Sequence, residues 1–259
     1  MSRTSGKYET GHVAAEGDLC VDDLNVRFAG AEPAAILEYA LGDKALGRLA
    51  MVSSFGTESA VLLHLVASVD PAADVLFIDT GKHFPETLDY VEELTRFIGL
   101  SNVTSIGPEE TEVAAKDEKG LRWSYDPDAC CALRKVRPLE RALKGFDGSI
   151  TGRKAFQADT RAALQPFERE DGRWKVNPLA TWTKADLDAY FDEHKLPRHP
   201  LEAEGYLSVG CAPCTSKVLP GEDIRAGRWR QFDKTECGIH VTGFARKGDD
   251  GSGDDGGNS

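Results

Sequence analysis

Short runs of consecutive apolar residues alternate along the chain with longer segments whose apolar residues recur at helical spacing. The apolar runs predict strands at about residues 49–54, 74–79, 102–106 and 149–151. Helices are predicted at 58–69, at 85–98, from Cys131 to about 143, and from a capping-box sequence at Thr183 to about His194. Buried strands that alternate with helices are typical of parallel sheets covered on both faces. We therefore predict an α/β fold with a mostly parallel sheet flanked by helices.

The two ends of the chain differ from its middle in composition. Residues 1–22 are polar with scattered glycine, and residues 247–259 contain no apolar side chain. Such segments cannot bury enough apolar surface to fold, so we expect both to be disordered, the second as an acidic tail. Between them we expect one α/β domain at 23–233, followed by a short tail at 234–241.

Composition and charge exclude several classes of protein. The chain has 259 residues, 41% of them hydrophobic, and a net charge of -12, which makes it a poor general partner for nucleic acid. We expect no signal peptide and no membrane span, and six cysteines are too few for a disulfide scaffold. These features together indicate a cytoplasmic protein. Eight bases against three acids lie between Arg134 and Arg161, and Arg225, Arg228 and Arg230 add a second basic patch. This clustering predicts a small anionic ligand, and the sequence leaves a homo-oligomer open.

The segment Ser53-Ser54-Phe55-Gly56-Thr57-Glu58-Ser59 connects the first predicted strand to its helix. Small residues there let the backbone approach a ligand, and free N–H groups at a helix start attract an anion. The segment is not a Walker A loop, because it lacks Gly-Lys-Ser/Thr. Serine and threonine also cap helices for structural reasons alone, so both interpretations stay open for Ser53, Ser54, Gly56 and Thr57.

Four of the six cysteines have the spacing of a metal site. Cys130 and Cys131 are adjacent, and Cys211 and Cys214 form a Cys-x-x-Cys pair. Adjacent cysteines do not readily pair with each other, and four thiolates suit either a structural zinc ion or a [4Fe–4S] cluster. A zinc ribbon would use two Cys-x-x-Cys knuckles, so the adjacent pair is atypical for zinc. Cys20 has no partner in this pattern.

A further cysteine stands alone in Glu236-Cys237-Gly238-Ile239-His240. Cysteine attacks as the thiolate, which nearby positive charge favours, and Gly238 would leave the sulfur accessible. A lone cysteine is more often a small core residue than a nucleophile. The polar neighbours Lys234, Thr235 and Glu236 argue against a core position here.

Taken in order, these segments resemble the assimilatory adenylyl-sulfate (APS) and phosphoadenylyl-sulfate (PAPS) reductases, a branch of the adenine-nucleotide α-hydrolase-like fold. The resemblance covers about residues 50–241. Besides the loop at Ser53–Glu58 it is carried by Asp79-Thr80-Gly81, Phe84-Pro85-Glu86-Thr87, Cys130-Cys131-Ala132-Leu133-Arg134-Lys135, His199-Pro200-Leu201, the segments 205–215 and 221–229, and Lys234 to His240.

The resemblance implies a reaction and a set of ligands. Cys237 would attack the sulfur of the sulfonucleotide, displace AMP and become an S-sulfocysteine, from which reduced thioredoxin or a similar dithiol would release sulfite. A [4Fe–4S] cluster would be held by Cys130, Cys131, Cys211 and Cys214. Contacts to the phosphosulfate are implied for Lys135, Arg225 and Arg228, and a contact on the substrate side for His240.

One segment departs from the family pattern, which is commonly Gly-x-Arg-Arg-Glu/Asp-Gln-Ser after the strand. This chain has Gly152-Arg153-Lys154-Ala155-Phe156-Gln157, so its basic pair is shifted by one position. Arg153 and Lys154 are both candidate contacts, with Arg161 as a further one. Cluster-containing members mostly use APS and some accept PAPS, so the resemblance favours adenylyl sulfate, with a PAPS reductase or a dual-specificity enzyme as the alternative.

Two other functions compete with this interpretation. Some ATP-dependent tRNA-thiolating enzymes have a related loop and a cysteine-held cluster, but they expect Ser-Gly-Gly-x-Asp-Ser and lack the Glu-Cys-Gly-Ile-His segment. A non-catalytic metal-binding sensor would need the four paired cysteines and would make Cys237 dispensable.

Overall fold

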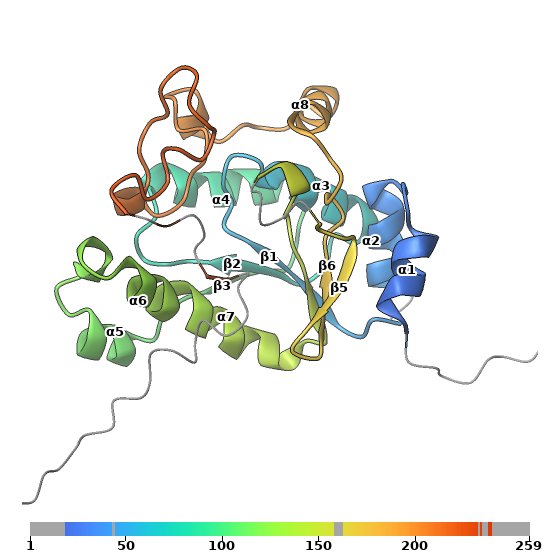
Figure 1. The fold of residues 1–259 in the computed structure, drawn as a ribbon, viewed down its shortest axis with the longest axis horizontal. Coiled ribbons are helices and arrows are strands. Elements are labelled where there is room, and N and C mark those ends of the chain that lie inside the picture. Colours follow the sequence, from blue (N-terminus) through green and yellow to red (C-terminus); the bar gives the residue numbers. More distant parts are fainter. Residues whose placement is uncertain (1–18, 43–44, 158–162, 233, 235–237, 240–259) are drawn as a thin grey trace, which may run out of the picture.

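The computed structural model describes residues 19–42, 45–157, 163–232, 234 and 238–239. Within them, six strands form one sheet in the order β3-β2-β1-β4-β6-β5 (Figure 1). Neighbouring strands are parallel except β5 and β6, which pair antiparallel, so the predicted mostly parallel sheet is confirmed. The strands are β1 (Leu49–Ser53), β2 (Val75–Ile78), β3 (Val103–Ile106), β4 (Gly148–Ile150), β5 (Phe167–Glu170) and β6 (Arg173–Val176).

Helices cover both faces of the sheet, as Figure 1 shows. Leu49 and Met51 of β1 point into a large core, whereas Ala50 of the same strand packs on the opposite face with Leu139. Because both faces are buried, β1 is apolar at successive positions instead of alternating with polar residues. The large core contains residues of α1 (Val21–Arg27), α2 (Pro33–Gly42), α3 (Ser59–Val69), α4 (Pro85–Ile98) and α8 (Lys184–Glu193), while α5 (Glu110–Lys116), α6 (Pro127–Cys131) and α7 (Arg137–Ala142) lie across the sheet.

Several predicted boundaries match the structure closely. Helix α4 begins at Pro85, in the first turn as expected, and α8 begins with the predicted capping box between Thr183 and Asp186. Helix α1 starts at Val21, which lies inside the segment 1–22 that was expected to be disordered. Residues 1–18 and 247–259 lie outside the described residues. No helix in the described part of the chain is long and apolar enough to cross a membrane.

The helix that was expected to follow Cys131 begins earlier, so that prediction was wrong at its start. Asp126 caps the helix by accepting a hydrogen bond from the Ala129 amide at 3.0 Å, and Pro127 occupies the first turn. Cys130 and Cys131 therefore lie inside α6. A π-helical segment at Ala132–Val136 continues it into α7. Such segments are frequent at functional sites, and this one carries Arg134 and Lys135.

Candidate functional site

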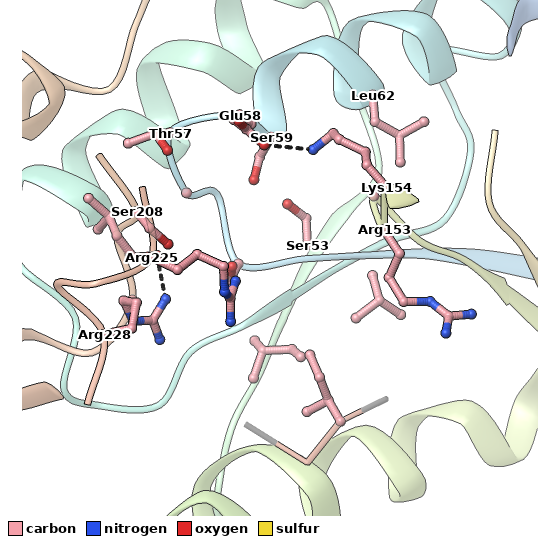
Figure 2. A pocket seen from close by; sticks show the side chains of 18 of the residues that line it. Ser53, Thr57, Glu58, Ser59, Leu62, Arg153, Lys154, Ser208, Arg225 and Arg228 are labelled. Atoms are coloured by element: carbon pink, nitrogen blue, oxygen red, sulfur yellow. Dashed lines mark hydrogen bonds and ion pairs between the residues drawn. The ribbon is translucent and has the colours of Figure 1, made fainter. Parts of the chain in front are cut away.

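A cleft lies over the carboxyl ends of β1, β2 and β4, where an open α/β sheet binds its ligands (Figure 2). Its walls come from the loop after β1, the segment after β4, the π-helical segment and two segments near the end of the chain. It is lined by all the described residues that the sequence predicted as substrate contacts, namely Ser53, Ser54, Gly56, Thr57, Lys135, Arg153, Lys154, Arg225 and Arg228.

The loop between β1 and α3 is fixed by an aromatic anchor. Phe55 is fully buried, packs edge-on against Phe77 at 5.4 Å between ring centroids, and has a φ of 49°. A left-handed conformation is costly for a bulky residue, so packing must hold it. The Phe55 amide also donates to Ser53 Oγ at 3.1 Å, and Thr57 Oγ1 donates to the Leu207 carbonyl at 3.0 Å. Phe55 therefore turns inward while the small residues beside it face the cleft.

Arg153 and Lys154, the shifted basic pair after β4, form ion pairs with two different carboxylates. Lys154 has a buried side chain and lies 2.9 Å from Glu58, the last residue before α3. Arg153 pairs with Glu168 of β5 and lies 3.3 Å from Thr151 Oγ1. Figure 2 shows Lys154 pointing toward Glu58 and Arg153 extending away from it. Both residues line the cleft, but only Lys154 reaches across to the loop after β1.

Arg228 lies against the backbone of the segment that leads to Cys211. Its Nη1 is 3.3 Å from the Val209 carbonyl oxygen, and its guanidinium lies 4.5 Å from the centroid of the Trp229 ring. A Cβ at Gly210 would come within 2.2 Å of Arg228 Nη2, so a larger residue there would displace the guanidinium from this position. Gly210 therefore decides where this cation sits. Arg225 joins Arg228 on the same wall of the cleft.

His83 also lines the cleft, and sequence reasoning missed it. Its Nε2 lies 2.9 Å from the Ile78 carbonyl, which can only accept, so Nε2 carries the proton. Nδ1 is buried and has no hydrogen-bond partner among the described residues. Burial lowers the pKa of His83, and Lys135 and Arg228 act in the same direction. The ring is therefore a neutral acceptor in a cation-lined cleft. Its position after Asp79-Thr80-Gly81 was the only available signal.

A second cavity, beside the cleft, brings the four paired cysteines together. Cys130, Cys131, Cys211 and Cys214 all line it, and none of the four is in a disulfide. The described residues contain no group of three or more His, Cys, Asp or Glu side chains arranged to hold one metal ion. A single zinc ion binds each sulfur at about 2.3 Å and so draws its ligands close together. A four-iron cluster is also held by four thiolates, which bind different iron atoms, and this donor set fits it.

The electrostatics of the four thiols are uneven. Burial raises the pKa of Cys130 to about 12, with Cys131 and Cys211 acting in the same direction. Burial also acts to raise the pKa of Cys211, but Lys135, Thr80 and Arg228 outweigh it and lower that pKa. Thr80 Oγ1 lies 3.3 Å from Cys211 Sγ. Of these two cysteines, Cys211 is therefore the more favourable position for an anionic sulfur.

The two cavities share a wall, because Lys135 and Trp229 line both of them. The neighbour of Lys135, Arg134, faces a different partner. Its Nη2 lies 2.8 Å from Asp117, whose side chain is 1% exposed, and its Nη1 donates to the Thr80 carbonyl at 2.9 Å. Arg134 therefore fixes the π-helical segment against the end of β2, which places Lys135 between the cysteines and the cleft.

Three predicted residues, Cys237, Arg161 and His240, lie outside the described residues. Gly238 and Ile239, which separate Cys237 from His240 in the sequence, are described: Gly238 is buried with a φ of 85°, and Ile239 lines the cleft. The chain that directly follows Cys237 therefore reaches the same cleft as the predicted anion contacts.

Comparison with known proteins gives a consistent result. The model of the phosphoadenosine phosphosulfate reductase domain matches residues 48–217. A protein of Mesorhizobium japonicum named adenosine 5'-phosphosulfate reductase is 48% identical over 221 residues, covering 85% of this chain and 87% of the relative. One of Deinococcus radiodurans with the same name is 45% identical over 216 residues, covering 80% and 81%.

Solved structures agree with this assignment. The crystal structure of phosphoadenylyl-sulfate reductase from Candida auris matches with a TM-score of 0.66 and 30% identity, covering 79% of this chain and 99% of that one. FMN adenylyltransferase from Candida glabrata, at 16% identity and a TM-score of 0.51 over 88% of this chain and 81% of its own, shares the fold alone. The predicted adenine-nucleotide α-hydrolase-like fold is thereby confirmed, and the chain belongs to the phosphoadenosine phosphosulfate reductase domain family.

Proposed function

We propose that this chain reduces adenylyl sulfate to sulfite and AMP, with Cys237 as the nucleophile and a [4Fe–4S] cluster held by Cys130, Cys131, Cys211 and Cys214. The observation that carries the proposal is the shared wall between a cleft lined by cations and a cavity lined by four cysteines, none of which is in a disulfide. The relatives named adenosine 5'-phosphosulfate reductase, at 48% and 45% identity, support the same substrate.

In the proposed reaction the cleft binds the phosphosulfate among Lys135, Arg225 and Arg228. The Cys237 thiolate attacks the sulfur atom, the bond from sulfur to the bridging phosphate oxygen breaks, and AMP leaves with its electron pair. The oriented cations stabilise the negative charge that develops on the leaving phosphate. The product on the enzyme is S-sulfocysteine at Cys237.

A dithiol completes the turnover. One thiolate of reduced thioredoxin, or of a similar protein, attacks the sulfur of Cys237, and sulfite leaves with the electrons of the S–S bond. The second thiol of the dithiol then resolves the mixed disulfide and restores Cys237. The two electrons that reduce the substrate thus come from the dithiol, which is oxidised to a disulfide.

The cluster has an electrostatic role in this proposal. When bound, it would place a fixed charge next to Lys135, whose side chain is buried and therefore weakly screened by water. Lys135 faces both cavities, so it holds its ammonium between the cluster ligands and the bound phosphosulfate. The chain's own residues then orient the substrate and exclude water.

Charge pairing in the cleft supports adenylyl sulfate over its 3'-phosphorylated form. A 3'-phosphate needs a cation to receive it. Of the basic residues that the structure describes after β4, Lys154 is paired with Glu58 and Arg153 with Glu168. A second phosphate placed there would face these carboxylates. The alternative, a PAPS reductase or a dual-specificity enzyme, would require those pairs to break.

Turnover of purified holoenzyme with each nucleotide and reduced thioredoxin tests the proposal. We expect sulfite and AMP from adenylyl sulfate, and Cys237→Ser should abolish them while leaving the visible absorbance of the cluster intact. Cys214→Ser should lose that absorbance and the activity together. Cys20→Ser is the matched control, because Cys20 is exposed and outside the cysteine cavity. Faster reduction of the 3'-phosphorylated nucleotide would overturn the substrate assignment.

A further inference from the structure

We propose that Lys234, Asp128 and Trp229 form a latch that docks the segment leading to Cys237 onto helix α6. Lys234 and Asp128 would then be positioning residues for sulfur transfer, in addition to the residues that contact the substrate. The inference rests on the proposed role of Cys237 as the nucleophile.

The latch joins two parts of the chain that are far apart in the sequence. The Lys234 ammonium forms an ion pair with Asp128, which lies in the first turn of α6, two residues before Cys130. The Lys234 side chain is 7% exposed, whereas that of Asp128 is 62% exposed. Lys234 Nζ also lies 5.7 Å from the centroid of the Trp229 ring. A cation buried over an aromatic face and paired with a carboxylate is held from two sides.

Trp229 provides the fixed side of the latch. Its ring is buried, lines both cavities, and its amide donates to the Cys214 carbonyl at 3.0 Å. Its φ of 48° is unfavourable for a tryptophan unless the surrounding structure holds it. Two further backbone bonds, from Phe232 to Trp229 at 2.7 Å and from Lys234 to Phe232 at 2.9 Å, carry this constraint on to Lys234.

Anchoring Lys234 matters because Cys237 is only three residues further along the chain. Three residues of extended chain span about 10 Å, so a fixed Lys234 sets an upper limit on the distance between this anchor and Cys237. Ile239, on the other side of Cys237, lines the cleft. Confining a nucleophile near its target raises its effective concentration without any new contact to the substrate. The latch therefore affects the rate of sulfur transfer more than nucleotide affinity.

A single-turnover experiment tests the latch directly. Holoenzyme is mixed with adenylyl sulfate without reductant, and S-sulfocysteine at Cys237 is followed by mass spectrometry. Because one partner is exposed, we expect Asp128→Ala and Lys234→Met to slow the step roughly two- to fivefold, with AMP affinity and cluster absorbance unchanged. The charge exchange, Asp128→Lys with Lys234→Asp, should recover part of the rate. Asp188→Ala, which breaks the Lys184 pair on α8, is the matched control.

Limited trypsin digestion gives a second measurement that does not depend on turnover. Trypsin cleaves after lysine, so a Lys234 held by Asp128 and Trp229 should resist cleavage, and Asp128→Ala should make cleavage there faster. Wild-type S-sulfocysteine formation in Asp128→Ala would overturn the latch, as would loss of cluster absorbance in that variant. If Cys237→Ser still turned over, the proposed function itself would fail, which is a different result.

Discussion

Acid should destabilise the packing of the segment that leads to Cys211, because His199 is buried as a neutral imidazole. His199 is 1% exposed, and its ring packs on Tyr90 at 4.9 Å between centroids. Nδ1 accepts from the Leu201 amide at 3.3 Å, so Nε2 carries the proton and donates to Thr87 Oγ1 at 3.0 Å. A second proton on Nδ1 would break the bond to Leu201 and leave a buried cation.

The size of the effect follows from the pKa of His199. Burial lowers this pKa from 6.5 to about 4; Glu86 opposes the change, and His83 adds to it. At acidic pH the folded protein then binds fewer protons than the unfolded chain. The contribution of His199 to stability is therefore complete above its pKa in the unfolded chain, and it is lost as the pH falls toward its pKa in the folded protein. When the pH is lowered from about 7.5 to about 5, protonation of His199 should lower the free energy of unfolding by about 2 kcal/mol. For a chain of this size that is roughly 4–8 °C in Tm.

The measurement compares wild-type holoenzyme with His199→Asn by thermal unfolding at both pH values and one scan rate. Asparagine can still accept from the Leu201 amide but does not titrate, so its Tm should fall less on acidification than that of the wild type. Other titrating groups remain in both proteins and cancel in the comparison. Cluster absorbance recorded in the same samples controls for loss of iron. An equal fall in Tm for the two proteins would show that protonation of His199 does not destabilise the fold.

Gly210, Arg134 and the four paired cysteines can each be tested by one further experiment. Gly210→Ala should push the Arg228 guanidinium aside, since a Cβ would lie 2.2 Å from its Nη2. KM for adenylyl sulfate should then rise about tenfold. Tm should change little, because only a flexible side chain must move. Arg134→Leu should lower the free energy of unfolding by about 3–5 kcal/mol, because it leaves the buried carboxylate of Asp117 without its ion pair; a change in Tm of under about 2 °C would contradict this. Removal of iron with a chelator should expose about four more thiols to a thiol reagent, and an unchanged thiol count would contradict the cluster assignment.

Sequence reasoning located the parallel part of the sheet because those strands are apolar on both faces. Strands β1, β2 and β3 and helices α3 and α4 were predicted within one or two residues of their ends. The hairpin of β5 and β6 was missed, because neither strand contains a run of consecutive apolar residues. Buried and charged residues alternate in this hairpin, which lies at the edge of the sheet. Its signal was nevertheless present: Asp171-Gly172 forms the two-residue turn, and both residues have positive φ.

The candidate site was predictable in its residue types but not in its pairings. The small residues of the loop at Ser53–Thr57 were expected to face an anion and line the cleft, as do the described basic candidates Lys135, Arg153, Lys154, Arg225 and Arg228. Arg230, which the sequence grouped with Arg225 and Arg228, does not line the cleft and pairs with Glu222. The partner of Lys154 is Glu58, 96 residues earlier, so only the folded chain could reveal that pair. The orphaned Nδ1 of His83 likewise depends on the geometry at the end of β2.

The order of the strands explains why the cysteines and the cleft meet at one point. From β1 the chain proceeds outward through β2 to β3, then returns to place β4 on the other side of β1. The crevice at such a reversal, beyond the carboxyl ends of the strands, is where open α/β sheets bind ligands. Cys130 and Cys131 lie just before the return to β4, and Cys211 and Cys214 follow after β6, so the reversal lets two distant pairs converge beside the loop of β1. The adjacency of the cysteine cavity and the cation-lined cleft is therefore a consequence of this topology, which no local motif encodes.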